Sequence, residues 1–73
     1  MSVAYASIQD GSKDVWIVDA VSGGRIRHIH AQQDIGQTYV SGDVCIIIYA
    51  VKSGGVKGES HDCKSGAYLR TLS

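Results

Sequence analysis

The sequence predicts an all-β domain, a small antiparallel meander that forms a six- or seven-stranded barrel or sandwich. Three observations lead to this prediction. The 73 residues contain nine Gly and no Pro, and most of the glycines fall in short polar stretches typical of hairpin turns. The segments between them are rich in Val, Ile and Tyr, which suit a pleated strand better than a helix. A chain of this length is expected to form one domain, residues 1–73.

Seven strands are expected in succession, joined by turns that contain Gly. The first three are Val3–Gln9, Asp14–Val21 and Arg25–His30. A connector, residues 31–43, carries the fourth at Gln37–Val40 and holds at most one helical turn, because Gly36 would end a helix at once. The last three are Val44–Val51, Val56–Cys63 and Ala67–Leu72.

Residues 1–30 and 44–73 also match each other when one is laid on the other without a gap. The identical pairs are Gly11 with Gly54, Asp19 with Asp62, Ser22 with Ser65, Gly23 with Gly66, and Arg27 with Arg70. This internal repeat predicts two similar three-stranded units. The Asp-x-x-Ser-Gly pattern resembles the last hairpin of a β-propeller blade, but this chain would supply fewer than two of the four or more blades a propeller needs.

Composition excludes several classes of protein. Seven Lys and Arg balance seven Asp and Glu, whereas nucleic-acid-binding domains are usually strongly basic. A near-zero net charge favours self-association instead. The longest apolar run, Val44–Val51, is far shorter than the roughly 20 residues of a membrane-spanning helix. We therefore expect no nucleic-acid partner and no membrane partner.

Cysteine usage and the first residues suggest a compartment. The first ten residues contain no Lys or Arg and no apolar run of the kind a secretory signal has. Cys45 and Cys63 lack the spacing of a metal or redox pair, and without a signal the default compartment is reducing. We therefore expect two free thiols and a cytoplasmic protein.

The run Val44–Val51 is apolar on both faces of the expected strand. Alternation places Val44, Ile46, Ile48 and Ala50 on one face and Cys45, Ile47, Tyr49 and Val51 on the other. One face can line the core, and the second needs cover that a chain without helices hardly supplies. We expect the face with Cys45, Ile47, Tyr49 and Val51 to form a homo-oligomer interface. The alternative is a small sandwich in which both faces are internal.

The histidines fall in two strand tripeptides. Residues two apart in a strand point the same way, so His28 converges with His30, and His61 with Cys63. These four are candidate zinc ligands. The alternative is that the histidines lie partly exposed on a polar sheet face, because His-x-His alone is a weak signal. If they cluster at an interface, their protonation below about pH 6 would loosen assembly.

Arginine and tyrosine provide candidate binding residues. Arg25 and Arg27 are expected to share one strand face, where paired guanidinium groups can grip an anion, or where they simply discourage edge pairing. Tyr39, Tyr49 and Tyr68 are expected at a binding patch, and Trp16 is expected to be a buried anchor. The Gly pairs precede strands rather than helices, so they form no phosphate-binding loop.

These observations favour a small protein-binding or structural interaction module that acts as a homo-oligomer and needs no cofactor. Its partner would be another copy and possibly another protein, bound along a strand edge or through an apolar, tyrosine-bearing patch. A metal- or anion-binding oligomer is the alternative. An enzyme with a site between subunits is less favoured, because a chain of this size seldom builds a pocket alone.

Overall fold

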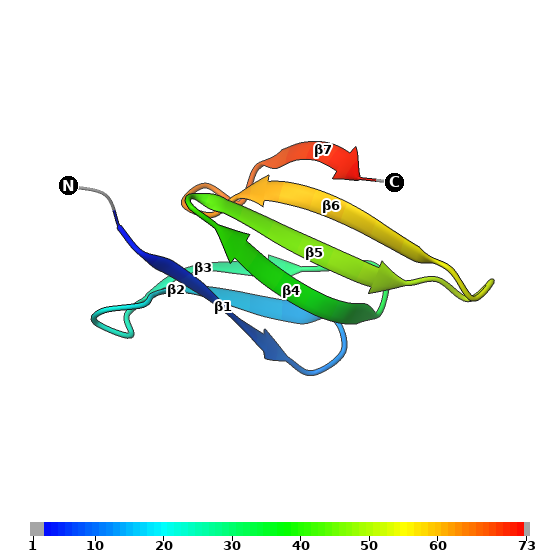
Figure 1. Cartoon of the computed structure of the whole chain (residues 1–73). Helices are drawn as coiled ribbons and strands as arrows, with labels where there is room; N and C mark the ends of the chain where they lie inside the picture. Colours follow the sequence, from blue (N-terminus) through cyan, green and yellow to red (C-terminus); the bar gives the residue numbers. More distant parts are fainter. Residues whose placement is uncertain (1–2, 73) are drawn as a thin grey trace.

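The computed structural model describes residues 3–72 and confirms an all-β fold of seven antiparallel strands (Figure 1). They are β1 (Tyr5–Asp10), β2 (Asp14–Asp19), β3 (Arg25–His30), β4 (Ile35–Ser41), β5 (Val44–Ala50), β6 (Val56–Asp62) and β7 (Tyr68–Leu72). Every expected strand is present, although several bounds move by one or two residues. Residues 31–34 form an irregular link rather than a helical turn. Over the described residues there is no helix with the length and apolarity needed to span a membrane.

The turns form where the glycines predicted them. Gly11, Gly23, Gly42, Gly54 and Gly66 all have positive φ, a conformation that residues with a Cβ resist. Two turns also share one hydrogen-bonding pattern. The Oδ1 of Asp19 accepts from the backbone N–H groups of Val21 and Ser22, and the Oδ1 of Asp62 accepts from those of Lys64 and Ser65. The likeness holds for these turns, and the wider internal repeat stays a prediction.

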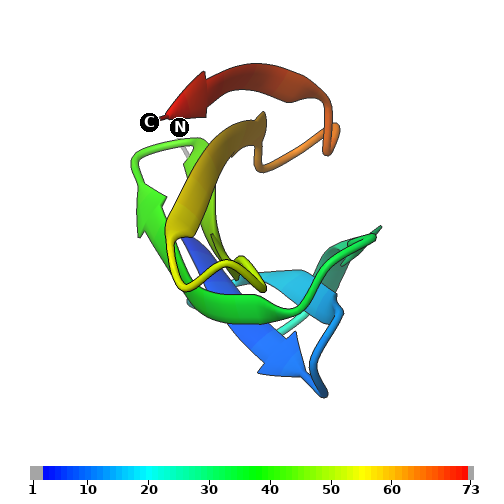
Figure 2. The same ribbon diagram turned by 90° about the vertical axis from the view of Figure 1, so that its right-hand side faces the viewer.

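The strands are divided between two sheets. One has the order β1-β2-β3 and the other the order β4-β5-β6-β7. β1 lies beside β4, where Ser7 Oγ bonds Thr38 Oγ1 at 2.9 Å and Gln9 Nε2 donates to the Ile35 carbonyl at 2.9 Å. Seen end-on, the strands follow an arc with β3 at one end and β7 at the other (Figure 2). Over residues 3–72 the two sheets do not close into a barrel.

The core lies inside this arc. Val15, Ile17 and Ile29 from the three-stranded sheet pack with Ile35, Ile47 and Tyr49 from the four-stranded sheet, together with the two cysteines. Cys45 and Cys63 form a disulfide, so the expectation of free thiols is wrong. The β5–β6 hairpin pairs Cys45 with His61, which brings Cys63 to a Cα–Cα distance of 5.2 Å, within the usual range for a disulfide.

The disulfide is at odds with the reducing compartment that was expected from the first residues of the sequence, and the cytoplasmic location stays a prediction. Structural disulfides persist mainly in oxidising compartments. In a chain with so small a core, a covalent link between neighbouring strands is a common source of added stability.

The apolar strand β5 has its two faces the other way round from the expectation. Cys45 and Ile47 are each 1 % exposed and Tyr49 is 7 % exposed, because their face is the one that meets the three-stranded sheet. They form core, not an interface, and Val51 lies half-buried just after the strand. The face that stays half-exposed carries Val44, Ile46 and Ile48. Alternation alone distinguishes two faces but does not show which of them turns inward.

Candidate functional site

The outer face of the four-stranded sheet carries an apolar patch, formed by Tyr39, Ile46, Ile48 and Leu72. Register places Tyr39 opposite Ile46, and it places Ile48 and Leu72 on either side of Gly58. A Cβ added to Gly58 would meet Ile48 Cδ1 and Leu72 Cβ, each at 3.2 Å. The two side chains thus close over this glycine and join the patch across three strands. Tyr39 is 51 % exposed and Leu72 is 36 % exposed.

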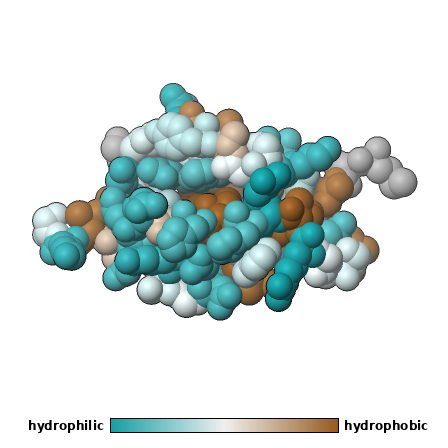
Figure 3. Space-filling model, turned by 180° about the vertical axis from the view of Figure 1, so that it is seen from behind, coloured by the Kyte–Doolittle hydropathy of each residue, from teal (hydrophilic) through white to brown (hydrophobic). Residues whose placement is uncertain are grey.

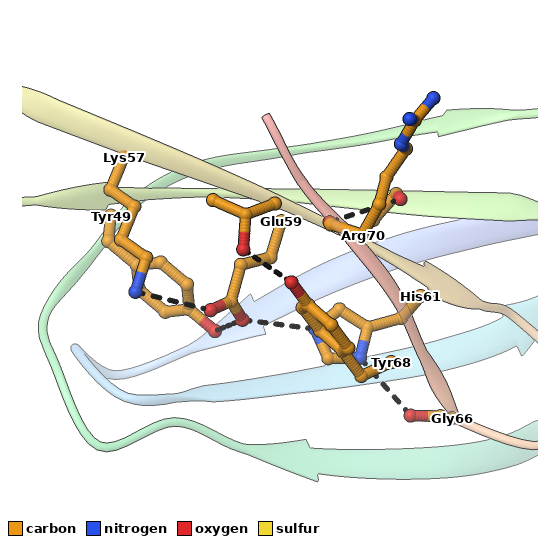
Figure 4. Close-up of polar contacts among 9 residues, drawn as sticks. Tyr49, Lys57, Glu59, His61, Gly66, Tyr68 and Arg70 are labelled. Carbon is orange, nitrogen blue, oxygen red and sulfur yellow. Dashed lines mark hydrogen bonds and ion pairs between the residues drawn. The ribbon is translucent and has the colours of Figure 1, made fainter. Parts of the chain in front are cut away.

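A polar cluster occupies the opposite, inner face near the open side of the arc (Figure 4). Glu59 is its centre. Its Oε1 accepts from the Tyr49 hydroxyl at 3.2 Å and lies 3.4 Å from His61 Nε2, while Oε2 lies 3.6 Å from Lys57 Nζ. His61 Nδ1 lies 3.2 Å from the Gly66 carbonyl. The ring of Tyr68 on β7 meets the His61 ring edge-on at 5.9 Å.

The contacts of this cluster define its chemistry. A carbonyl oxygen only accepts, so His61 Nδ1 carries a proton and donates to Gly66. Burial, reinforced by the neighbouring carboxylate of Glu59, raises the pKa of Tyr49 to about 12. Tyr49 is therefore a neutral hydrogen-bond donor at physiological pH.

A cavity of about 340 Å³ opens beside the cluster. Its walls include Ile29 and His30 at the end of β3, Gln32 and Gln33 of the link, and the polar cluster on β5 and β6. Figure 3 looks onto this open side and shows apolar surface between mainly hydrophilic margins. The cavity lies between β3 and β6, which belong to different sheets and are not paired with each other.

Arg25 and Arg27 are not brought together as a pair. A register shift at Ile17/Val18 sets Arg27 opposite Ile17 and Arg25 opposite Val18. Arg25 lies 4.6 Å over the Trp16 ring, whereas Arg27 Nε donates to the Lys64 carbonyl at 3.3 Å across the opening. Trp16, expected as a buried anchor, is only half-buried and also packs against His28 at 4.7 Å. The structure thus gives the two arginines different contacts.

The candidate zinc ligands are also divided. His28 Nε2 and His30 Nδ1 converge as expected, but both meet Asp14 Oδ1 at 2.8 Å. The hydrogen bond from His30, then that from His28, holds the pKa of Asp14 below its usual value. Cys63 is committed to the disulfide and has no thiolate to offer a metal. Within residues 3–72 no group of three or more His, Cys, Asp or Glu is arranged to hold a metal ion.

Lys57 and Glu59 were not among the expected site residues. A signal for them was present, because Lys57, Glu59 and His61 alternate along one strand and therefore share a face. Their register with Tyr49, Ile47 and Cys45 places that face inward. Of the expected tyrosines, Tyr49 lies in the polar cluster, Tyr68 adjoins it, and Tyr39 lies on the outer apolar patch.

The comparisons with known proteins offer no relative. No protein-family model matches the chain, and no curated protein or solved structure does so either. The outer apolar patch, the polar cluster and the open strand edges are the structural features on which a function can rest.

Proposed function

We propose that this chain is a structural interaction module that associates with a second copy of itself through the outer apolar patch. The observation that carries the proposal is the half-exposed face of β5, continued by Tyr39 on β4 and Leu72 on β7. A contiguous exposed apolar patch on a sheet commonly marks a protein-binding surface.

A second copy is the occupant that the chain itself favours. Arg70 shares this face of the sheet. The four patch residues themselves are uncharged and the chain has a formal net charge of zero, so two copies do not repel each other at long range. A two-fold pair would use the same patch on both subunits. A chain of this size gains from such burial, because its own core supplies only about 3–5 kcal/mol.

The test is the absolute mass in solution by light scattering coupled to size exclusion, over a range of protein concentrations. The wild type should give a discrete dimer mass, and Tyr39→Lys should give a monomer, because a charge would be buried in the interface. Val21→Lys is the matched control, since Val21 is an apolar turn residue, 87 % exposed and outside the sheet. It should leave the dimer intact.

Two results would contradict the proposal. One is a monomer mass for the wild type at every concentration up to the millimolar range. The other is a dimer that survives Tyr39→Lys and also Leu72→Lys, which would place the contact elsewhere on the molecule. Circular dichroism of each variant checks that the sheet is retained.

A further inference from the structure

The open side of the arc offers a second interaction surface, which shares only β7 with the outer apolar patch. Its margins are β3 on one sheet and the hairpin of β6 and β7 on the other. β7 is the last strand of its sheet and all five of its residues are exposed. Edge strands present unpaired backbone N–H and C=O groups that can bind another strand.

Charge is unevenly distributed around this opening. Five of the seven Lys and Arg residues lie on the two margins, namely Arg25, Arg27, Lys57, Lys64 and Arg70. Only two of the seven acidic residues lie there, Glu59 and Asp62. The other acidic residues are Asp10, Asp14, Asp19, Asp34 and Asp43. The strands that border the opening thus carry a net positive charge, and the rest of the chain carries a net negative charge.

Both acidic residues of the margins already have partners. Glu59 is contacted by Tyr49, Lys57 and His61, and Asp62 accepts from the backbone N–H groups of the β6–β7 turn. The ion pair of Lys57 with Glu59 offsets one positive charge with one negative charge. The margins keep a net charge of +3, because five cations outnumber two carboxylates.

The cations also lie at suitable places along the opening. Arg27 crosses it at the end near the β6–β7 turn, where it bonds the Lys64 carbonyl. Lys57 lies near the other end, on the wall of the cavity. Arg70 pairs with Ser60 on the outer side of β7, and its side chain points away from the polar cluster (Figure 4). Cations thus flank β7 on both faces.

We propose that β7 binds an extended acidic segment of another protein, added as a further antiparallel or parallel strand at the open edge. Backbone hydrogen bonds to β7 supply affinity, and acidic side chains at alternate positions meet Lys57 and Arg27 on the inner face or Arg70 on the outer face. β3 is the less suitable edge, because Arg25 is stacked on Trp16 and both of its histidines contact Asp14.

The test uses the full chain with a fluorescently labelled, acetylated octapeptide of alternating Glu and Val. We expect saturable binding by anisotropy that weakens with salt. The matching Lys-Val octapeptide should bind at least about tenfold less tightly. A Glu-Gly octapeptide keeps the charge but has poor strand propensity, and it should also be weaker. In the Glu-Val peptide, N-methylation of the alternate backbone amides that face β7 should abolish binding. N-methylation of the other alternate set, which faces away from β7, should not.

Variants then locate the surface. The double variant Arg27→Gln with Lys57→Gln should weaken the affinity for the Glu-Val peptide by about tenfold. The control, Lys13→Gln with Lys52→Gln, removes the same charge away from the margins and should change that affinity by less than about twofold. Lys57→Gln alone serves if the first pair perturbs folding. The proposal fails if the Glu-Val peptide does not bind, if Lys-Val or Glu-Gly binds as well, or if both charge-matched pairs weaken binding equally.

Discussion

The disulfide between β5 and β6 gives the most quantitative prediction. Cys45 and Cys63 are 18 residues apart, and a cross-link that closes such a loop lowers the entropy of the unfolded chain. The loop-closure relation gives about 0.6 kcal/mol from its constant term and about 2.6 kcal/mol from its length term at 25 °C. Breaking the bond should therefore lower the free energy of unfolding by about 3 kcal/mol, a large share of the roughly 3–5 kcal/mol that so small a core supplies.

Reduction is the cleanest perturbation, because it breaks the link and keeps both buried sulfur atoms. Urea unfolding is followed by the fluorescence of Trp16, the one tryptophan in the sequence, with and without a phosphine reductant. With a slope of about 1 kcal/mol per molar urea, the midpoint should fall by about 3 M. A variant with Cys45→Ala and Cys63→Ala should be at least as unstable, and the reductant should not affect it further.

Two results would refute this reasoning. Free thiols that label in urea without any reductant would show that the bond does not form. A shift below about 0.5 kcal/mol on reduction would show that the bond forms but does not limit the unfolded chain. Intact mass before and after thiol labelling distinguishes these cases.

Three further predictions concern single residues. Gly66→Ala should destabilise the fold by more than the roughly 1 kcal/mol that replacing a glycine at positive φ costs, because the new Cβ would meet Arg27 Cδ at 3.0 Å. Gly11→Ala is the matched control, since Gly11 has a similar φ in open space, and equal urea midpoints for the two variants would contradict the Arg27 contact. Absorbance at 295 nm should show a tyrosine that ionises near pH 12, and this transition should be absent in Tyr49→Phe. Because the folded pKa exceeds the ordinary 10.0, the stability that Tyr49 contributes is full below about pH 10 and is lost as pH rises through 12. Hydrogen bonds from Ser65 and Lys64 lower the pKa of Asp62 below 3.8, so the stability that Asp62 contributes is present above that value and is lost as pH falls through the folded pKa. Asp62→Asn should therefore flatten the acid side of the profile of stability against pH, and an unchanged profile would contradict the turn contacts.

Local chemistry made the strands and turns predictable. Glycine at positive φ was predictable at the hairpins, because a residue with a Cβ is strained there. The alternation of β5 was likewise readable as two apolar faces. Which of the two faces turns inward was not predictable, because the inward face of β5 is the one that meets Val15 and Ile17 of the other sheet. The disulfide was within reach of the sequence, since the hairpin that was expected between residues 51 and 56 already brings Cys45 close to Cys63.

The candidate sites were harder to predict because each depends on pairing between distant segments. Arg25 and Arg27 have the spacing of a pair on one face, but the register shift at Ile17/Val18 gives them different contacts. His28 and His30 do converge, and Asp14 on the neighbouring strand takes both nitrogen atoms that a metal would need. A spacing rule applies within one regular strand, and it fails where a bulge or a cross-strand partner intervenes.

The two interaction surfaces can be tested separately because β5 and β6 divide their side chains between opposite faces. Ile46 and Ile48 face outward with Tyr39, whereas Lys57, Glu59 and His61 face inward beside the opening. A change on one face leaves the register and contacts of the other in place. Tyr39→Lys should therefore abolish the dimer and retain binding of the Glu-Val peptide, while Lys57→Gln should retain the dimer and weaken binding of the peptide. Loss of both properties in either variant would mean that dimerisation and strand binding depend on one surface, and the two proposals would then reduce to one.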